Sequence, residues 1–341
     1  MSVYEPPSFP STIDLDLSRN EGQPNLGVLE LDVETVAALA RRYPDTSRLA
    51  RLIAERHQVD ENRVLVTAGG DDAIFRTFLS RRGKRAVSTT PTFEMIPRYA
   101  EQCGVSLAEI PWWDGDLPLD DLEGFDAEMA VIVSPNNPTG STIEEDDLLA
   151  LAGRFPLVVL DAAYTDFADV DLTPVALSHR NVVVIRTLSK AFGLAGLRVG
   201  YLLGAAGVVS EVRGFGSPYA VSGLSAALAA DSLTTGSEPA ERFVRAVVEE
   251  RARLIDLLSE LGARPLPSQG NFVLATETEP ESLVADAASQ GVGLRRFPGR
   301  PGLERCVRIG LPGDADEFER LFGVLWAALA PDRELEVADV W

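Results

Sequence analysis

The sequence predicts an α/β protein in which a mostly parallel sheet is covered by helices, together with a second, smaller α/β domain. Short apolar runs alternate with helical patterns over the first two thirds of the chain. Polar or glycine-containing turns follow those runs. The length of 341 residues exceeds the size at which one core usually keeps growing, so two domains are expected.

The predicted strands are short apolar runs that end in polar turns. They lie at 63–68, 85–88, 129–133, 157–160 and 182–185. Helical patterns lie between them, for example at 71–79 and 144–152. Strands and helices that alternate in this way favour parallel strands, and ligands bind beyond the carboxyl ends of such strands.

The pattern changes near residue 238. A long helical stretch at 241–258 is followed by short apolar runs at 270–275 and 306–310, which predicts a smaller α/β domain. We therefore expect three parts. They are an N-terminal arm that belongs to the small domain (1–35), a large domain (36–237) and a C-terminal small domain (238–341).

Composition argues against several classes of protein. A net charge of -21 disfavours binding to nucleic acid through its phosphates. No apolar run approaches the roughly 20 residues that span a bilayer, and the first residues lack the basic start and apolar run of a secretory signal. The two cysteines, Cys103 and Cys306, have no metal-ligand spacing and suggest reduced thiols. We expect a cytoplasmic protein without a metal site, a membrane or a nucleic-acid partner.

Lysine is nearly absent, since Lys84 and Lys190 are the two lysines among 31 basic residues. Arginine stays protonated, whereas a desolvated lysine can become a neutral amine and attack a carbonyl. Lys190 is therefore a candidate covalent catalyst. Lys84 lies in the basic turn 81–85, which is typical of a solvated surface.

Two turns after predicted strands contain unusual polar residues. In Ala68-Gly-Gly-Asp-Asp72, free backbone N–H groups and the helix dipole can bind a phosphate, although a structural turn with an Asp cap would explain the same residues. Ser134-Pro-Asn-Asn-Pro-Thr-Gly140 contains two asparagines, which is more than a simple reversal of direction requires.

Two further strand ends contain ionisable residues. Asp161 ends one strand and is followed by Tyr164, although a helix cap or a buried ion pair would also account for Asp161. After the last of these strands come two hydroxyls, a lysine and an arginine. These residues, Thr187, Ser189, Lys190 and Arg198, can bind a phosphate and present an amine.

The segments 134–140 and 187–198 resemble the two signatures of the fold-type I pyridoxal-phosphate enzymes, specifically the class II aminotransferases near histidinol-phosphate aminotransferase. The resemblance runs from about residue 18 to residue 313. It implies the fold-type I transferase fold with pyridoxal 5'-phosphate as cofactor. It also implies transfer of an amino group from an amino acid or a histidinol-phosphate-like amine to a 2-oxo acid, in a homodimer with its active site at the subunit interface.

The resemblance assigns catalytic roles to Lys190, Asp161 and Tyr164. Lys190 would form a Schiff base with the cofactor aldehyde and, once released, act as the general base. Asp161 would keep the pyridine nitrogen protonated, and Tyr164 with Asn137 would hydrogen-bond the phenolic oxygen. The remaining cofactor contacts are implied for Phe93 on the ring, for Gly70, Asp71, Thr187, Ser189 and Arg198 on the phosphate, and for Tyr43 on the phosphate of the neighbouring subunit.

Substrate contacts are implied for four residues. Arg308 would bind the substrate carboxylate, unless it makes a surface ion pair. Arg295 and Arg296 resemble the arginine that meets a substrate phosphate, although a solvated basic turn would also contain them. Asn20 begins Asn20-Glu-Gly-Gln-Pro24, which lacks the aromatic residue found there in many histidinol-phosphate enzymes, and Ala220 replaces a common Asn. Both departures suggest a changed side-chain specificity.

The same motif set occurs in threonine-phosphate decarboxylase and in related oxidases and lyases. These enzymes remain alternatives, because the bond aligned perpendicular to the cofactor ring is the one cleaved. A non-catalytic cofactor-binding module of a transcription regulator is less expected. The first 18 residues are too few and too acidic for the basic DNA-binding unit that such chains normally append.

Overall fold

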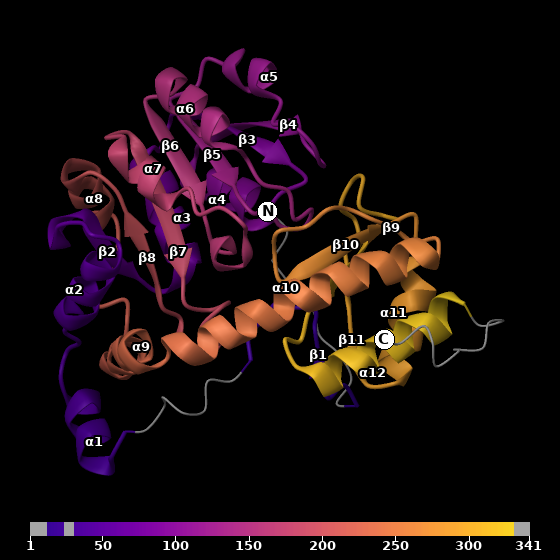
Figure 1. The fold of residues 1–341 in the computed structure, drawn as a ribbon. Helices are drawn as coiled ribbons and strands as arrows, with labels where there is room; N and C mark the ends of the chain where they lie inside the picture. The colour runs from indigo at the N-terminus through magenta and orange to yellow at the C-terminus, as the bar shows by residue number, and fades with distance from the viewer. Residues whose placement is uncertain (1–11, 24–30, 331–341) are drawn as a thin grey trace.

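The computed structural model describes residues 12–23 and 31–330 and shows two lobes joined by the long helix α10 (Ser237–Glu260) (Figure 1). The larger lobe is built on a seven-stranded sheet of order β2-β8-β7-β6-β5-β3-β4. Its strands are β2 (Val64–Thr67), β3 (Arg85–Thr90), β4 (Ser106–Pro111), β5 (Met129–Val133), β6 (Leu157–Asp161), β7 (Val182–Thr187) and β8 (Gly200–Leu203).

The prediction of a mostly parallel sheet is confirmed. Strands β4, β3, β5, β6 and β7 pair in parallel, while β8 runs antiparallel to both β7 and β2. Strands β4 and β8 were not predicted from the sequence. The β4 strand is mostly exposed or half-buried and ends in a proline, so it lacks the continuous apolar run of its buried neighbours.

Helices cover both faces of this sheet. One core packs α3 (Gly69–Ser80), α4 (Met95–Cys103) and α8 (Ala206–Arg213) against one face. The other face packs against α2 (Ser47–Arg56), α5 (Leu119–Glu123), α6 (Glu145–Arg154) and α7 (Thr173–Ser178). Successive residues of β5 alternate between the two cores, and both cores exclude water. This explains why the strand is apolar throughout instead of alternating with polar residues.

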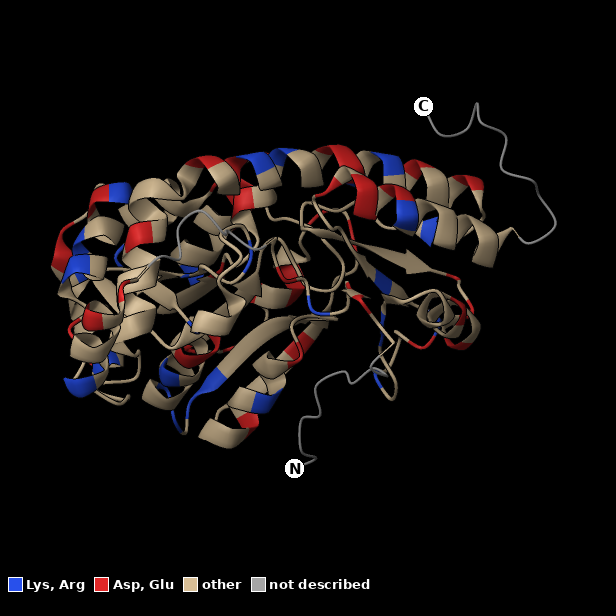
Figure 2. Cartoon of the chain, turned by 90° about the horizontal axis from the view of Figure 1, so that it is seen from below, with Lys and Arg blue, Asp and Glu red and all other residues tan. Residues whose placement is uncertain are grey.

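The larger lobe also contains α1 (Val33–Arg41) and α9 (Gly223–Thr235), with short 3-10 helices η1 (Glu61–Arg63), η2 (Thr165–Phe167) and η3 (Ala195–Leu197). Acidic and basic residues are interspersed along the long helix at the top of Figure 2. No described helix is both long and apolar enough to cross a membrane.

The smaller lobe contains an antiparallel sheet of order β12-β13-β10-β9 and the helices α11 (Pro280–Ser289) and α12 (Ala315–Leu329). Its strands are β9 (Arg264–Pro265), β10 (Phe272–Thr276), β12 (Arg295–Arg296) and β13 (Val307–Gly310). The N-terminal strand β1 (Leu15–Asp16) pairs in parallel with β11 (Val292–Gly293), so the start of the described chain lies on this lobe.

The predicted domain limits at residues 35 and 237 stay predictions. Parts of the predicted arm and small domain, 1–11, 24–30 and 331–341, lie outside the described residues. The arm sequence that contains Pro24 is therefore described as far as Gln23.

The order of strands brings distant turns together. Val133 at the end of β5 is in register with Asp161 at the end of β6, which is in register with Ile185 in β7. The antiparallel β8 pairs with β7 and β2, and Thr67 and Thr187 are both in register with Gly200. The four polar segments identified in the sequence therefore meet at one edge of the sheet.

Replacing Gly200 with Ala is expected to lower the free energy of unfolding by about 1 to 3 kcal/mol, because the added methyl group overpacks a backbone contact. A Cβ at Gly200 would lie 2.5 Å from the carbonyl carbon of Gly69 and 2.6 Å from the amide nitrogen of Gly70. The matched control is Gly207→Ala in α8, where a Cβ meets no atom within 4 Å. Urea unfolding followed by circular dichroism measures both variants, and equal stability for the two would contradict the expected crowding.

Candidate active site

A cavity opens at the carboxyl ends of β5, β6 and β7, beside the first turn of α3. The residues that line it include most of those predicted from the sequence: Gly70, Asp71, Phe93, Asn137, Asp161, Tyr164, Thr187, Ser189, Lys190 and Arg198. These residues are brought together from five separate segments of the chain. Their positions fit the predicted cofactor site, while the role of each residue stays a prediction.

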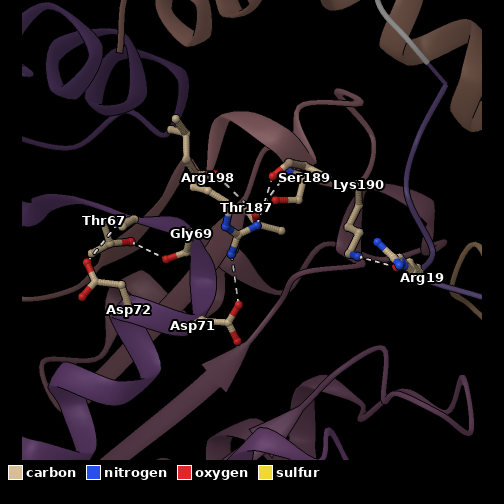
Figure 3. Close-up of polar contacts among 12 residues, drawn as sticks. Arg19, Thr67, Gly69, Asp71, Asp72, Thr187, Ser189, Lys190 and Arg198 are labelled. Atoms are coloured by element: carbon tan, nitrogen blue, oxygen red, sulfur yellow. Dashed lines mark hydrogen bonds and ion pairs between the residues drawn. The ribbon is translucent and has the colours of Figure 1, made fainter. Parts of the chain in front are cut away.

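One end of the cavity combines a helix N-terminus with a guanidinium group and two hydroxyls (Figure 3). Thr187 Oγ1 donates to Ser189 Oγ at 2.9 Å, and Arg198 Nη2 pairs with Asp71 Oδ2 at 3.1 Å. Gly69, at the start of α3, has φ +83, and a Cβ there would lie 2.6 Å from Arg198 Nη2. Glycine therefore lets the guanidinium approach the helix N-terminus, which favours anions.

Asp161 is buried at the last position of β6, with 4% of its surface exposed. Burial raises the pKa of its carboxyl from 3.8 to about 7, although a hydrogen bond from the backbone N–H of Ala163 opposes this rise. Such a carboxyl gains from a cation placed beside it in the cavity. A protonated pyridine nitrogen is a cation of this kind, so Asp161 fits the cofactor implied by the resemblance.

Lys190 reaches into the same cavity from the loop that follows β7. Its Nζ donates to the backbone carbonyl of Arg19 at 3.2 Å (Figure 3). The same atom lies 5.6 Å from the centre of the Tyr164 ring. The amine is thus directed to the middle of the site. Lys84, in the basic turn, is exposed and does not line this cavity, as expected for a solvated lysine.

Tyr164 is held by two amide side chains. Its hydroxyl oxygen accepts from Asn20 Nδ2 at 3.3 Å and from Asn137 Nδ2 at 3.5 Å. The ring packs edge-on against Phe272, with the ring centres 5.1 Å apart. Asn20 is 2% exposed with φ 53, and it contacts Tyr164 without lining either described cavity of the site. Its predicted contact with substrate is therefore less direct than the sequence suggested.

A second cavity adjoins the first and shares Arg19, Phe93, Asn137, Tyr164 and Lys190 with it. The smaller lobe contributes Arg308, whose Nη1 donates to Asn137 Oδ1 at 2.7 Å and whose Nη2 donates to the carbonyl of Ser18. Arg308 is 6% exposed, so the alternative of a surface ion pair does not apply. A buried guanidinium beside Lys190 can bind the carboxylate of a substrate.

The two arginines of β12 lie on opposite sides of the strand. Arg295 lines the second cavity and pairs with Glu94 at 3.4 Å. Arg296 is half exposed and pairs instead with Glu281 at 3.3 Å, outside both cavities. Because successive side chains of a strand point to opposite faces, one of the two was bound to face away from the site.

Tyr43 lies away from both cavities in this chain. It is 80% exposed and stacks on Tyr219, with the ring centres 4.6 Å apart. Its predicted contact reaches the phosphate of a neighbouring subunit, so a single chain does not test it.

Several residues of the site were missed from the sequence, namely Ser18, Arg19, Glu21, Glu94, Phe297 and Arg300. The backbone carbonyls of Ser18, Arg19 and Asn20 accept hydrogen bonds from Arg308, Lys190 and Asn271 respectively. A backbone carbonyl leaves no signal in a sequence. Glu94 does follow the predicted Phe93 directly, which is a signal that could have been used.

Comparison with known proteins gives one family. The family model for aminotransferase class I and II matches residues 38–325. A histidinol-phosphate aminotransferase of Thermococcus gammatolerans is 35% identical over 81% of this chain and 81% of its own length.

Two solved structures share the fold. Histidinol-phosphate aminotransferase from Sinorhizobium meliloti, in complex with pyridoxal-5'-phosphate, has a TM-score of 0.83 at 24% identity and covers 94% of this chain and 91% of its own. L-threonine-O-3-phosphate decarboxylase from Porphyromonas gingivalis has a TM-score of 0.78 at 22% identity, over 92% and 99% of the two chains. At these identities the two structures establish the fold alone.

Replacing Asp161 with Asn is expected to stabilise the cofactor-free protein at pH 8. The carboxyl has a folded pKa near 7 against 3.8 for an ordinary Asp, so its ionisation penalises the folded state. That penalty is absent below pH 3.8, grows between 3.8 and 7 and is complete above 7. At about 1.4 kcal/mol for each pKa unit, the difference between 3.8 and about 7 gives a gain at pH 8 of up to about 4 kcal/mol.

Urea unfolding of the cofactor-free protein at pH 8 and pH 4 measures this gain. The exposed Asp121→Asn serves as the control. A variant that is less stable than the wild type at pH 8 would mean that Asp161 is stabilised, not penalised, as an ion in the folded protein.

Proposed function

Because the chain belongs to the class I and II aminotransferases, we propose that its amino donor is histidinol phosphate or an amine like it. The protein is a pyridoxal-phosphate-dependent aminotransferase. The observation that carries the proposed donor is the second cavity, where Arg295, Arg300 and Arg308 gather beside Lys190 in a chain of net charge -21. An amine with a distal phosphate suits such a cavity.

The residues of the first cavity suit the cofactor. Lys190 would bind its aldehyde, Asp161 would face its ring nitrogen, and Tyr164 with Asn137 would contact its phenolic oxygen. Phe93 would pack on the ring. The phosphate would lie at the α3 N-terminus, where Thr187, Ser189, Arg198 and the backbone of Gly70 and Asp71 meet. When bound, pyridoxal phosphate supplies an electron sink for the charge left at the substrate Cα.

Proton transfer is the task we assign to Lys190. An amine released from the cofactor can take the proton from the substrate Cα and deliver it to the cofactor carbon. The carbonyl of Arg19 accepts a hydrogen bond from Nζ and directs the amine into the space shared by the two cavities. Arginine would be a poor substitute, because it does not lose its proton.

Substrate anions are assigned to the smaller lobe. Arg308 would bind the carboxylate of the 2-oxo acid, and its contact with Asn137 ties that arginine to the cofactor site. Arg295 would meet the distal phosphate. Arg296 lies outside both cavities, so we no longer assign it a substrate contact. Asn20 is assigned to Tyr164, which it contacts.

Decarboxylation of a phosphorylated amino acid is the alternative reaction. Its support is the fold shared with the threonine-phosphate decarboxylase of Porphyromonas gingivalis. The same lysine and carboxylate would serve both reactions, so the products separate them. Release of carbon dioxide without a keto or aldehyde product would favour the decarboxylase, and an amino group transferred to 2-oxoglutarate favours the aminotransferase.

We also propose a homodimer that acts in the cytoplasm. The α1 helix has no buried residue in the single chain, and Val33 on α1 and Tyr43 after it are 84% and 80% exposed, as expected of surfaces that a second subunit covers. Cys103 and Cys306 are both free and buried, which suits a reducing compartment. The division into an arm (1–35), a large domain (36–237) and a small domain (238–341) belongs to the same proposal.

Replacing Lys190 with Ala is expected to reduce transamination by at least about a thousandfold, because the covalent contact and the base are lost together. The matched control is Lys84→Ala, since Lys84 is the other lysine of the chain, is exposed and lines neither cavity. Steady-state rates with 2-oxoglutarate measure both variants. Substantial residual turnover in the Lys190 variant would remove the role assigned to it.

Histidinol phosphate added to the cofactor-loaded enzyme, without any keto acid, is expected to discharge the visible band of the bound cofactor and give the pyridoxamine spectrum. The same addition to the Lys190→Ala variant should leave no catalysed change. A panel of ordinary amino acids at equal concentration is the control. A stable spectrum with histidinol phosphate and a rapid change with another amine would reject the proposed donor and keep the aminotransferase.

A further inference from the structure

We propose that Arg300 extends the phosphate contact assigned above to Arg295, and that Glu94 is the internal counterion of both arginines, displaced when the phosphate of the amino donor binds. This inference rests on the proposed function, which it deepens by naming the residues that select the donor. Arg295 was predicted from the sequence, whereas Arg300 and Glu94 are placed beside it by their positions in the second cavity.

The three side chains form a loose cluster in the wall of this cavity. The carboxylate oxygens of Glu94 lie 3.4 and 3.5 Å from Arg295 Nη2, and Glu94 Oε2 lies 3.8 Å from Arg300 Nη1. Strong ion pairs of this kind are shorter, at about 2.7 to 2.9 Å. The side chains are 15 to 24% exposed, so solvent reaches the cluster from the cavity. The carboxylate therefore occupies a place between two guanidinium groups without being tightly held there.

Each arginine has a second contact that does not depend on Glu94. Arg300 Nη2 donates to the carbonyl of Thr92 at 3.0 Å. The Arg295 guanidinium lies 5.6 Å from the centre of the Phe297 ring. If the Glu94 carboxylate moves away, each guanidinium group keeps its second contact, and the space between the two groups remains suited to an anion.

Charge explains what such a subsite selects. Among the described residues that line the second cavity, Glu94 is the one carboxylate, beside Arg19, Lys190, Arg295, Arg300 and Arg308. A substrate carboxylate that displaces Glu94 replaces one negative charge with another, so the electrostatic attraction to the two guanidinium groups changes little. A phosphate brings up to two negative charges and a third oxygen, so it gains more from the two guanidinium groups. Because an anion must compete with the charge of Glu94, the two arginines bind a phosphate more strongly than a carboxylate.

Replacing Glu94 with Gln tests the counterion. The probes are methyl phosphate and acetate, measured as competitive inhibitors of the cofactor-loaded enzyme, whose own phosphate site is then occupied by the cofactor. We expect E94Q to bind methyl phosphate about tenfold more tightly and to gain measurable binding of acetate, because the competing charge is gone. The KM for histidinol phosphate should fall with kcat little changed. The control is E101Q, which removes an exposed carboxylate from α4, the helix that begins directly after Glu94.

Replacing Arg300 with Gln tests the subsite from the other side. R300Q is expected to weaken methyl phosphate binding about tenfold while the absorption spectrum of the bound cofactor is unchanged. The control is R305Q, an exposed residue on the same loop that pairs with Glu279. Glu94 and Arg300 then affect the same probe in opposite directions, which a general loss of folding would not do.

Three outcomes would overturn the inference. Weaker methyl phosphate binding in E94Q would mean that Glu94 organises the arginines or accepts a donor group of the substrate. Unchanged binding in E94Q would place the phosphate elsewhere, and unchanged binding in R300Q would remove Arg300 from the subsite. Failure of the proposed donor is distinguishable, because methyl phosphate binding responds to E94Q and R300Q whether or not histidinol phosphate is turned over.

Discussion

The buried carboxyl of Asp161 is the constraint around which the site is arranged. It ends a strand that is apolar throughout, and its burial raises the pKa of the carboxyl to about 7. An ionised group in this place costs stability unless a cation lies beside it. In the proposed site the ring nitrogen of the cofactor would supply that cation, so the carboxyl that destabilises the cofactor-free protein would be the group that keeps the bound ring protonated. Such a conflict between stability and local chemistry is typical of a functional site.

The sheet brings the other groups to Asp161. Parallel strands place the ends of β5, β6 and β7 side by side, and the close approach of β8 to the first turn of α3 adds the helix N-terminus. The smaller lobe completes the site across the second cavity. Arg308 joins Asn137 of the larger lobe to the carbonyl of Ser18 at the N-terminal end, so one side chain links three segments. In the proposed site, cofactor contacts would thus come from the ends of the sheet strands and substrate contacts from between the lobes.

The sequence predicted the sheet edge well because the signals there are local. An apolar run followed by a polar turn indicates both a strand and its end, and the scarcity of lysine separated Lys190 from Lys84. It did not predict contacts that depend on the relative placement of the lobes, such as Glu94 with Arg295. Nor did it show which of Arg295 and Arg296 faces the cavity, since that depends on the orientation of a two-residue strand. Asn20 turns toward Tyr164 through a backbone with φ 53, which its neighbours in the sequence do not indicate.

The near absence of lysine has a chemical consequence for the assembled site. The cations that face the two cavities are Lys190 and the arginines Arg19, Arg198, Arg295, Arg300 and Arg308. Burial lowers the pKa of Arg300 from its usual value, yet arginine in proteins keeps its proton. In the proposed mechanism, anion binding would therefore rest on groups whose charge is constant near neutral pH, and the proton transfer would be left to Lys190. This division would let the amine change its charge during the reaction while the groups that position the substrate keep theirs.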